Sequence, residues 1–181
     1  MMIQPLRSGM MLGAAILAAQ LGYSASHTNV QAQQRIEREV RRELVALPSY
    51  SLFDHFTFRV DGDTVTLMGK VSQPTLKTDA ERVAKRIEGV RKVANQIEVL
   101  PLSASDDQLR RVLYESIYGH SALQTLAVRA VPPIHIIVDN GTVTLEGVVA
   151  NELQKNVARI QANSVAGVSV LTNHLRVEQG S

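Results

Sequence analysis

The chain of 181 residues contains no cysteine, which excludes disulfide bonds, thiolate zinc sites and cysteine nucleophiles. The lipid-acceptor cysteine of a bacterial lipoprotein is excluded for the same reason. Tryptophan is absent and aromatic residues make up only 4% of the chain, so we expect cores built from Val, Leu, Ile and Ala. The formal net charge of +2 is too small to indicate nucleic-acid binding, which normally shows as a concentrated basic surface.

The sequence also lacks an apolar run of the roughly 20 residues that a membrane-spanning helix needs. A shorter run, Met10 to Leu21, follows Arg7 and precedes small and polar residues, with Val30, Gln31 and Ala32 as a cleavage site. This order predicts a signal peptide over residues 1–32, cleaved after Ala32, and a periplasmic protein. Secretion beyond the periplasm and an uncleaved membrane anchor are the alternatives.

Two stretches of nearly the same text, DGDTVTLMGKV at 61–71 and DNGTVTLEGVV at 139–149, lie 78 residues apart. The agreement continues in the same register, without a gap, to Val99 in the first copy and Val177 in the second. Such a register indicates a duplication and predicts two domains, residues 33–101 and 102–181. Each is near the lower size limit for an independent core.

Both copies contain the same order of predicted elements. The first has a helix over 34–47, a hairpin over 56–71, a helix from Pro74 to just before Gly89 and a strand over 93–100. The second has a helix over 106–120, a hairpin over 134–149, a helix over 151–165 and a strand over 169–177. The predicted class is α+β, with two tandem αββαβ units. Each unit is a small three-stranded mixed sheet packed on two helices, and its crossover helix makes one strand pair parallel.

The shared V-T-L-x-G-x-V strand, the G-V after the second helix and the x-N-x-[IL]-x-V final strand resemble the BON domain, here present twice in tandem. The resemblance implies a non-enzymatic periplasmic or secreted protein, without a cofactor, that supports the cell envelope under osmotic stress. It further implies binding to anionic phospholipid, attachment to envelope proteins, or chaperone activity. In two-domain lipid-binding members, the first helix of the second unit meets anionic lipid.

The recurring residues are best explained by structure. Gly69 and Gly147 are expected to permit a strand bulge or a close approach by a helix, and Gly89 and Gly167 to end helices in a left-handed conformation. Asn95 and Asn173 are expected to bond nearby backbone. None of these six residues is chemically reactive, so the duplication copied a fold element and not an active site.

No catalytic or metal site is predicted. The five histidines have no metal-ligand spacing on a helix, and His135 alternates within a strand, which favours a place on one strand face. Asp54 and His55 lack an accompanying nucleophile-bearing turn, and there is no glycine-rich phosphate loop.

The candidate lipid-binding residues are Arg110, Arg111, Tyr114 and Tyr118, on the first helix of the second unit. Arg110, Tyr114 and Tyr118 recur every four residues, opposite an inward face formed by Leu109, Val112, Leu113 and Ile117. Arginine can pair with phosphate, and tyrosine suits the headgroup level of a membrane. Two interpretations stay open, since both tyrosines are equally suited to packing against the first unit.

The loop that follows this helix also allows two interpretations. Its apolar residues Leu123, Leu126 and Val128 are suited either to entering lipid or to folding back onto the sheet. The predicted function is reversible association with anionic phospholipid or with envelope proteins. The alternative is a holdase-type chaperone that binds unfolded clients through the open sheet faces and this loop.

Overall fold

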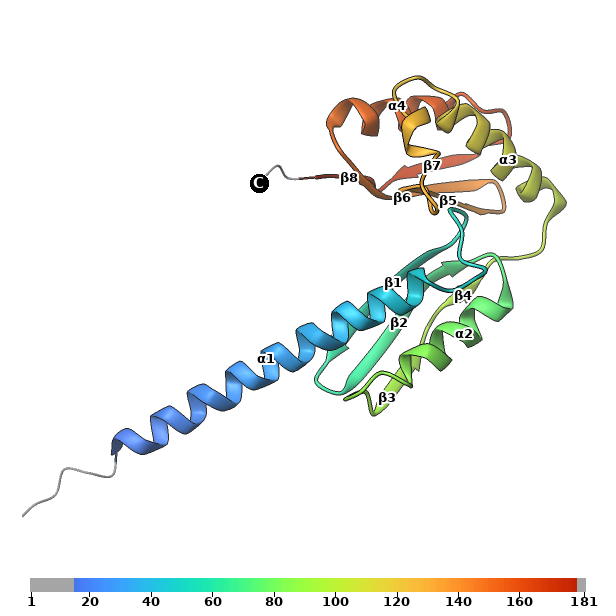
Figure 1. The fold of residues 1–181 in the computed structure, drawn as a ribbon. Coiled ribbons are helices and arrows are strands. Elements are labelled where there is room, and N and C mark those ends of the chain that lie inside the picture. The colour runs from blue at the N-terminus through green and yellow to red at the C-terminus, as the bar shows by residue number, and fades with distance from the viewer. Residues whose placement is uncertain (1–14, 179–181) are drawn as a thin grey trace, which may run out of the picture.

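The computed structural model describes residues 15–178, which form two units of the same architecture (Figure 1). The first unit contains α1 (Ala15–Val45), β1 (His55–Asp61), β2 (Thr64–Val71), α2 (Pro74–Ala84), β3 (Lys92–Asn95) and β4 (Glu98–Val99). The second contains α3 (Ala104–Tyr118), the short 3-10 helix η1 (Gln124–Leu126), β5 (Ile134–Asp139), β6 (Thr142–Val149), α4 (Glu152–Asn163), β7 (Val170–Asn173) and β8 (Arg176–Val177).

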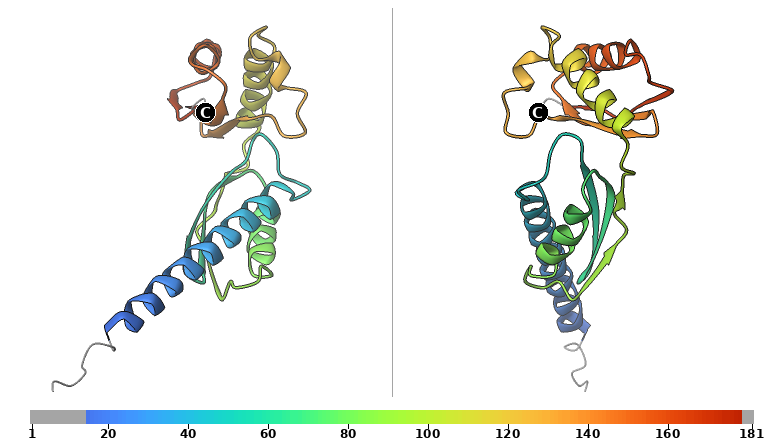
Figure 2. Two further views of the ribbon diagram at one scale, coloured as in Figure 1. Left: turned by 60° about the vertical axis from the view of Figure 1, so that its left-hand side comes forward. Right: turned by 90° about the vertical axis from the view of Figure 1, so that its right-hand side faces the viewer.

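Each unit has a mixed sheet with the hairpin's second strand at its centre. β2 pairs antiparallel with β1 and parallel with both β3 and β4, and β6 has the same relation to β5, β7 and β8. The helices of each unit cover one face of its sheet, and α3 and α4 lie on the side away from the first unit (Figures 1 and 2). The predicted α+β class, with two repeated units, is confirmed.

Each unit has its own apolar core between sheet and helices, built from aliphatic side chains as the composition indicates. Leu67, Leu76 and Ile97 are fully buried in the first core, and Leu113, Ile136 and Leu145 in the second. The α1 residues of the first core are Ile36, Val40 and Leu44. All three follow Ala32, so a chain of residues 33–181 retains them.

Residues 1–14 of the predicted signal peptide lie outside the described residues. α1 continues through the predicted cleavage site after Ala32 without a break, and cleavage there stays a prediction. Between residues 15 and 178, no helix has both the length and the apolar character required to cross a bilayer.

Gly69 and Gly147 occupy equivalent positions in the two central strands, with φ of +115° and +128°. A Cβ atom at Gly69 would overlap the carbonyl oxygen of His55, and one at Gly147 would overlap that of Pro133. The close approach is therefore made by the backbone that leads into the neighbouring strand and not by a helix. Gly89 and Gly167 also have positive φ, as expected, although each lies several residues beyond its helix.

The predicted final strand of each unit is in fact broken in two. Asn95 ends β3, where its Oδ1 accepts a hydrogen bond from Ile97 N (3.2 Å) and its Nδ2 donates to Lys77 O of α2 (2.8 Å). This bonding shifts the side-chain alternation by one residue, so Val99 is exposed and Leu100 is buried. Asn173 makes the equivalent bonds to Leu175 N and Lys155 O.

Two helix predictions also need correction. α2 ends at Ala84 rather than just before Gly89, because the next N–H groups, of Arg86 and Ile87, bond to the carbonyls three residues back instead of four. Val112 was predicted to face inward but is 41% exposed, because the buried face of α3 extends from Leu109 toward Arg110 and Tyr118, on the side away from Val112.

The hairpin of the second unit is held by a buried carboxylate from α3. Asp106 accepts hydrogen bonds from the backbone N–H groups of Asn140 (2.8 Å) and Gly141 (3.1 Å), both of which have the positive φ of a tight turn. Counting from the matched core residues Ile36 and Leu109, Gln33 has the equivalent position on α1. Its Nε2 donates to Val60 O (3.0 Å) and to Glu37 Oε1 of the same helix (3.3 Å), so each first helix bonds to its hairpin from the same place.

We expect Gly147→Ala to destabilise the second unit by on the order of 2 to 4 kcal/mol, since positive φ and overlap with the Pro133 carbonyl both oppose a side chain. Denaturant unfolding measures the change. Gly62→Ala is the matched control, because φ there is also positive (+61°) but the space around it is open. A loss as small as that of the control, about 1 kcal/mol, would contradict the close approach.

We also expect Asp106→Ala to reduce stability by about 2 kcal/mol or more, since it leaves two turn N–H groups without their acceptor. Gln33→Ala removes one hydrogen bond to the hairpin, at the Val60 carbonyl, and a partly exposed one to Glu37 on its own helix, and should cost about 1 kcal/mol. Chemical denaturation of both variants gives the comparison, and equal losses would show that Asp106 does not hold the turn.

Candidate functional site

The structure divides the four candidate lipid-binding residues between the interior and the surface. Arg110 and Tyr118 are only 5% and 3% exposed, whereas Arg111 is exposed and Tyr114 is partly buried. The four residues therefore do not form one exposed face, and the prediction that Arg110 and Tyr118 lie opposite the core is wrong.

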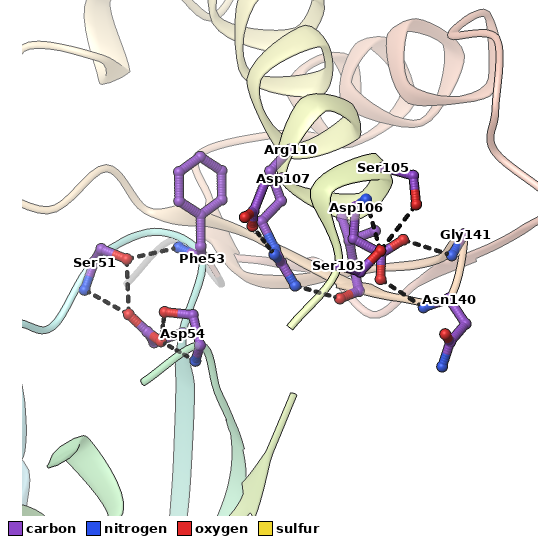
Figure 3. A network of polar contacts seen from close by, with 12 residues as sticks. Ser51, Phe53, Asp54, Ser103, Ser105, Asp106, Asp107, Arg110, Asn140 and Gly141 are labelled. Carbon is purple, nitrogen blue, oxygen red and sulfur yellow. Dashed lines mark hydrogen bonds and ion pairs between the residues drawn. The ribbon is translucent and has the colours of Figure 1, made fainter. Parts of the chain in front are cut away.

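Arg110 and Tyr118 bond to the outer edge of β5. The Tyr118 hydroxyl donates to Ile134 O (2.7 Å) and accepts from Ile134 N (2.9 Å), and Arg110 Nη2 donates to Val138 O (2.7 Å). Arg110 Nη1 is paired with the exposed carboxylate of Asp107 at 2.5 Å (Figure 3). Burial raises the pKa of Tyr118 well above the ordinary tyrosine value, so the hydroxyl keeps the proton that it donates. Unpaired backbone N–H and C=O groups at a sheet edge can pair with a strand of another chain, and here side chains of α3 bond to some of them instead.

The loop before β1 covers the rest of this edge and joins the two units. Ile136 N donates to Leu52 O (2.7 Å), and the side chains of Leu52 and Phe53 pack against the core of the second unit. The loop is shaped by the fully buried Asp54, which accepts hydrogen bonds from Ser51 and Ser72 (Figure 3). Asp54 thus has a structural role, with both carboxylate oxygens bonded to Ser51 and Ser72.

Charged and aromatic groups complete the contact between the units. Lys70 Nζ lies 2.7 Å from Asp139 Oδ2, and this bond lowers the pKa of Asp139 and raises that of Lys70. His135 lies in β5 on the face opposite the core, where Tyr50 and His55 of the first unit cover it. Among the described residues, no group of His, Asp and Glu side chains is arranged to hold a metal ion.

A hollow of about 420 Å³, here called the junction hollow, lies where the loop before β1 meets α3 and the loop before β5. It is lined by Leu52, Phe53, Arg111, Tyr114, Glu115, Ala127, Arg129, Ala130 and Pro132. Tyr114 lines the hollow together with Leu52 and Phe53 of the first unit, and Arg111 and Arg129 are exposed there. Sequence reasoning missed Arg129, because an isolated arginine in a loop has no periodicity to indicate its neighbours.

The apolar loop of the second unit is only partly available. Leu123 and Leu126 fold back into the core, whereas Val128, between lining residues Ala127 and Arg129, is 87% exposed. The hollow thus combines apolar lining residues with two exposed arginines, and the exposed Val128 adjoins one of them in the chain. That combination suits contact with a surface that is both anionic and apolar.

The chain resembles other proteins over most of its length. It is 25% identical to osmotically-inducible protein Y of Escherichia coli (strain K12) over 173 residues, covering 86% of this chain and 85% of that protein. Two structures of CdsD, a structural protein of the type III secretion system of Chlamydia trachomatis, align with lower similarity. One, its C-terminal domain, is 13% identical, with 78% of this chain and 96% of that chain covered and a TM-score of 0.27. The other is 12% identical, with 79% and 92% covered and a TM-score of 0.29.

The family model of the BON domain matches residues 32–101 and again residues 105–179. These two ranges contain both αββαβ units and leave only a short linker between them. The chain therefore belongs to the BON domain family and carries two BON domains in tandem.

Proposed function

We propose that this protein is a non-enzymatic, exported component of the cell envelope that binds reversibly to anionic phospholipid surfaces and supports the envelope under osmotic stress. The predicted signal peptide supports export, and the name of the related osmotically-inducible protein supports a role under osmotic stress. The junction hollow supports the activity, because its polar and apolar groups match the two layers of a membrane surface.

The observation that carries the proposal is the pair Arg111 and Arg129 beside the apolar floor formed by Leu52, Phe53 and Tyr114. The guanidinium groups pair with headgroup phosphates, and Val128 enters the apolar layer beneath them. Glu115 is the one acid that lines the hollow, so the arginines outnumber it. Arg110 and Tyr118 contribute indirectly, since they hold α3 against β5 and so place Arg111 and Tyr114.

Vesicle co-sedimentation of residues 33–181 tests this proposal. We expect binding to phosphatidylglycerol vesicles but not to phosphatidylcholine vesicles, and weaker binding at physiological salt than at low salt. The double variant Arg111→Glu, Arg129→Glu should lose at least tenfold in affinity, because each basic residue near an anionic surface contributes about 1 kcal/mol and reversal adds repulsion.

Arg38→Glu combined with Arg159→Glu is the matched control. It makes the same change in net charge at two exposed helix positions outside the junction hollow. If both double variants lost the same affinity, the effect would come from net charge alone, which would contradict a localised site. No binding to either kind of vesicle would remove phospholipid as the partner.

A holdase-type chaperone is the second candidate, and exposed apolar side chains on α4 favour it. Leu153 and Ile160 lie two helical turns apart on one face of α4, and both are more than half exposed. Binding of unfolded clients through them would tolerate salt and would not depend on Arg111 or Arg129. Suppression of client aggregation that is lost in Leu153→Ser, Ile160→Ser and kept in Arg111→Glu, Arg129→Glu would favour this function over lipid binding.

A further inference from the structure

The contact between the two units contains a buried histidine that has no hydrogen-bond partner at one ring nitrogen. His135 is 9% exposed, and its Nδ1 is unpaired. Its ring lies 5.6 Å, between centroids, from the ring of Tyr50 and also 5.6 Å from that of His55. Both neighbours belong to the first unit, so His135 is buried by the docking of the units and not by the fold of its own unit.

His55 extends the cluster toward a cleft of about 300 Å³ between the open faces of the two sheets. Its Nε2 lies 3.8 Å from Glu146 Oε2, and the other oxygen of Glu146 is 2.7 Å from His174 Nδ1. The other ionisable groups around the two rings are Asp54 and Tyr50 in the loop before β1 and Arg176 on β8, with the pair Lys70–Asp139 at the same cleft.

These surroundings oppose ionisation of both rings. Burial lowers the pKa of His135, and neighbouring His55 lowers it further, whereas the backbone and carboxylate of Asp54 and the backbone of Ser51 act in the other direction. Burial likewise lowers the pKa of His55, and Arg176 and His174 add to this effect against the attraction of Glu146. If His135 were protonated, its positive charge would lie beside His55, and its Nδ1–H would have no hydrogen-bond acceptor.

We propose that the contact between the two BON units is acid-sensitive: protonation of His135, together with His55, separates the units while each remains folded. Separation gives both rings access to water. Each unit keeps its own core, and the units are joined by the short segment between β4 and α3. The contacts that oppose separation are the packing of Leu52 and Phe53 against the second core, the Leu52–Ile136 backbone bond and the Lys70–Asp139 pair.

The sign follows from proton binding. A histidine whose pKa is lowered in the docked form binds fewer protons there than in the separated form. Docking is therefore fully favoured above the ordinary histidine pKa of about 6.5 and weakens as the pH falls below it. Below that pH the equilibrium constant for docking falls by up to about tenfold per pH unit for each histidine, until the lowered pKa of the docked form is reached.

The absence of native cysteine permits a direct distance measurement. Spin labels are attached to Arg38→Cys on α1 and Arg159→Cys on α4 in residues 33–181, and their separation is measured by pulsed electron spin resonance at pH 8 and pH 5. We expect a narrow distance distribution at pH 8 and a broad, longer one at pH 5, with unchanged circular dichroism. The carboxylate of Asp139, whose pKa is lowered, stays ionised over this range.

His135→Phe, which cannot ionise and can still stack on Tyr50, should keep the narrow distribution at pH 5. His135→Gln with His55→Gln serves the same purpose if the larger ring disturbs packing. His120→Gln is the matched control, because His120 lies outside the cluster and its loss should leave the acid response intact. Identical distributions at pH 8 and pH 5 in the parent chain, or separation at pH 5 of the variant that lacks both His135 and His55, would overturn the proposal. No lipid is present, so the result is independent of the proposed membrane binding.

Discussion

The outer edge of β5 is the constraint on which the arrangement of the second unit depends. An edge strand presents backbone groups that must find partners or remain open to other strands. Here three different sources supply those partners: the Tyr118 hydroxyl at Ile134, the Leu52 carbonyl at Ile136 and the Arg110 guanidinium at Val138. Two of them come from α3 and one from the first unit. The same edge therefore orients α3 on its sheet and attaches the two units to each other.

The duplication allows the two copies of one position to be compared. Counting from Ile36 and Leu109, the α1 counterparts of Arg110 and Tyr118 are Glu37 and Val45, which cannot make the same bonds. Val60, the counterpart of Val138, receives its bond from Gln33 instead. The residues that differ between the copies are thus the ones that cover the outer edge of β5, and the residues that recur, such as Gly69 and Gly147, shape each unit separately.

This difference explains how far the sequence could predict the molecule. The repeat, the hairpins and the parallel crossover follow from alternation and turn residues, which are local and recur in both copies. Helical periodicity assigns polar residues to the solvent face, and it misplaced Arg110 and Tyr118 because long polar side chains can reach a buried strand edge. The break after Asn95 depends on the bond from its side chain to Lys77 O of α2, which lies 18 residues earlier. The junction hollow depends on a loop that belongs to the other unit. Neither leaves a periodic signal.

One short segment, Tyr50 to His55, takes part in both proposals. Leu52 and Phe53 form part of the floor of the junction hollow, whereas Tyr50 and His55 flank His135 on the other side of the same contact. Because the segment is held by the buried Asp54, it moves as one piece with the first unit. Separation of the units would therefore remove two apolar residues from the hollow while leaving Arg111 and Arg129 in place on the second unit. The apolar part of membrane contact would then depend on docking, and the electrostatic part would not.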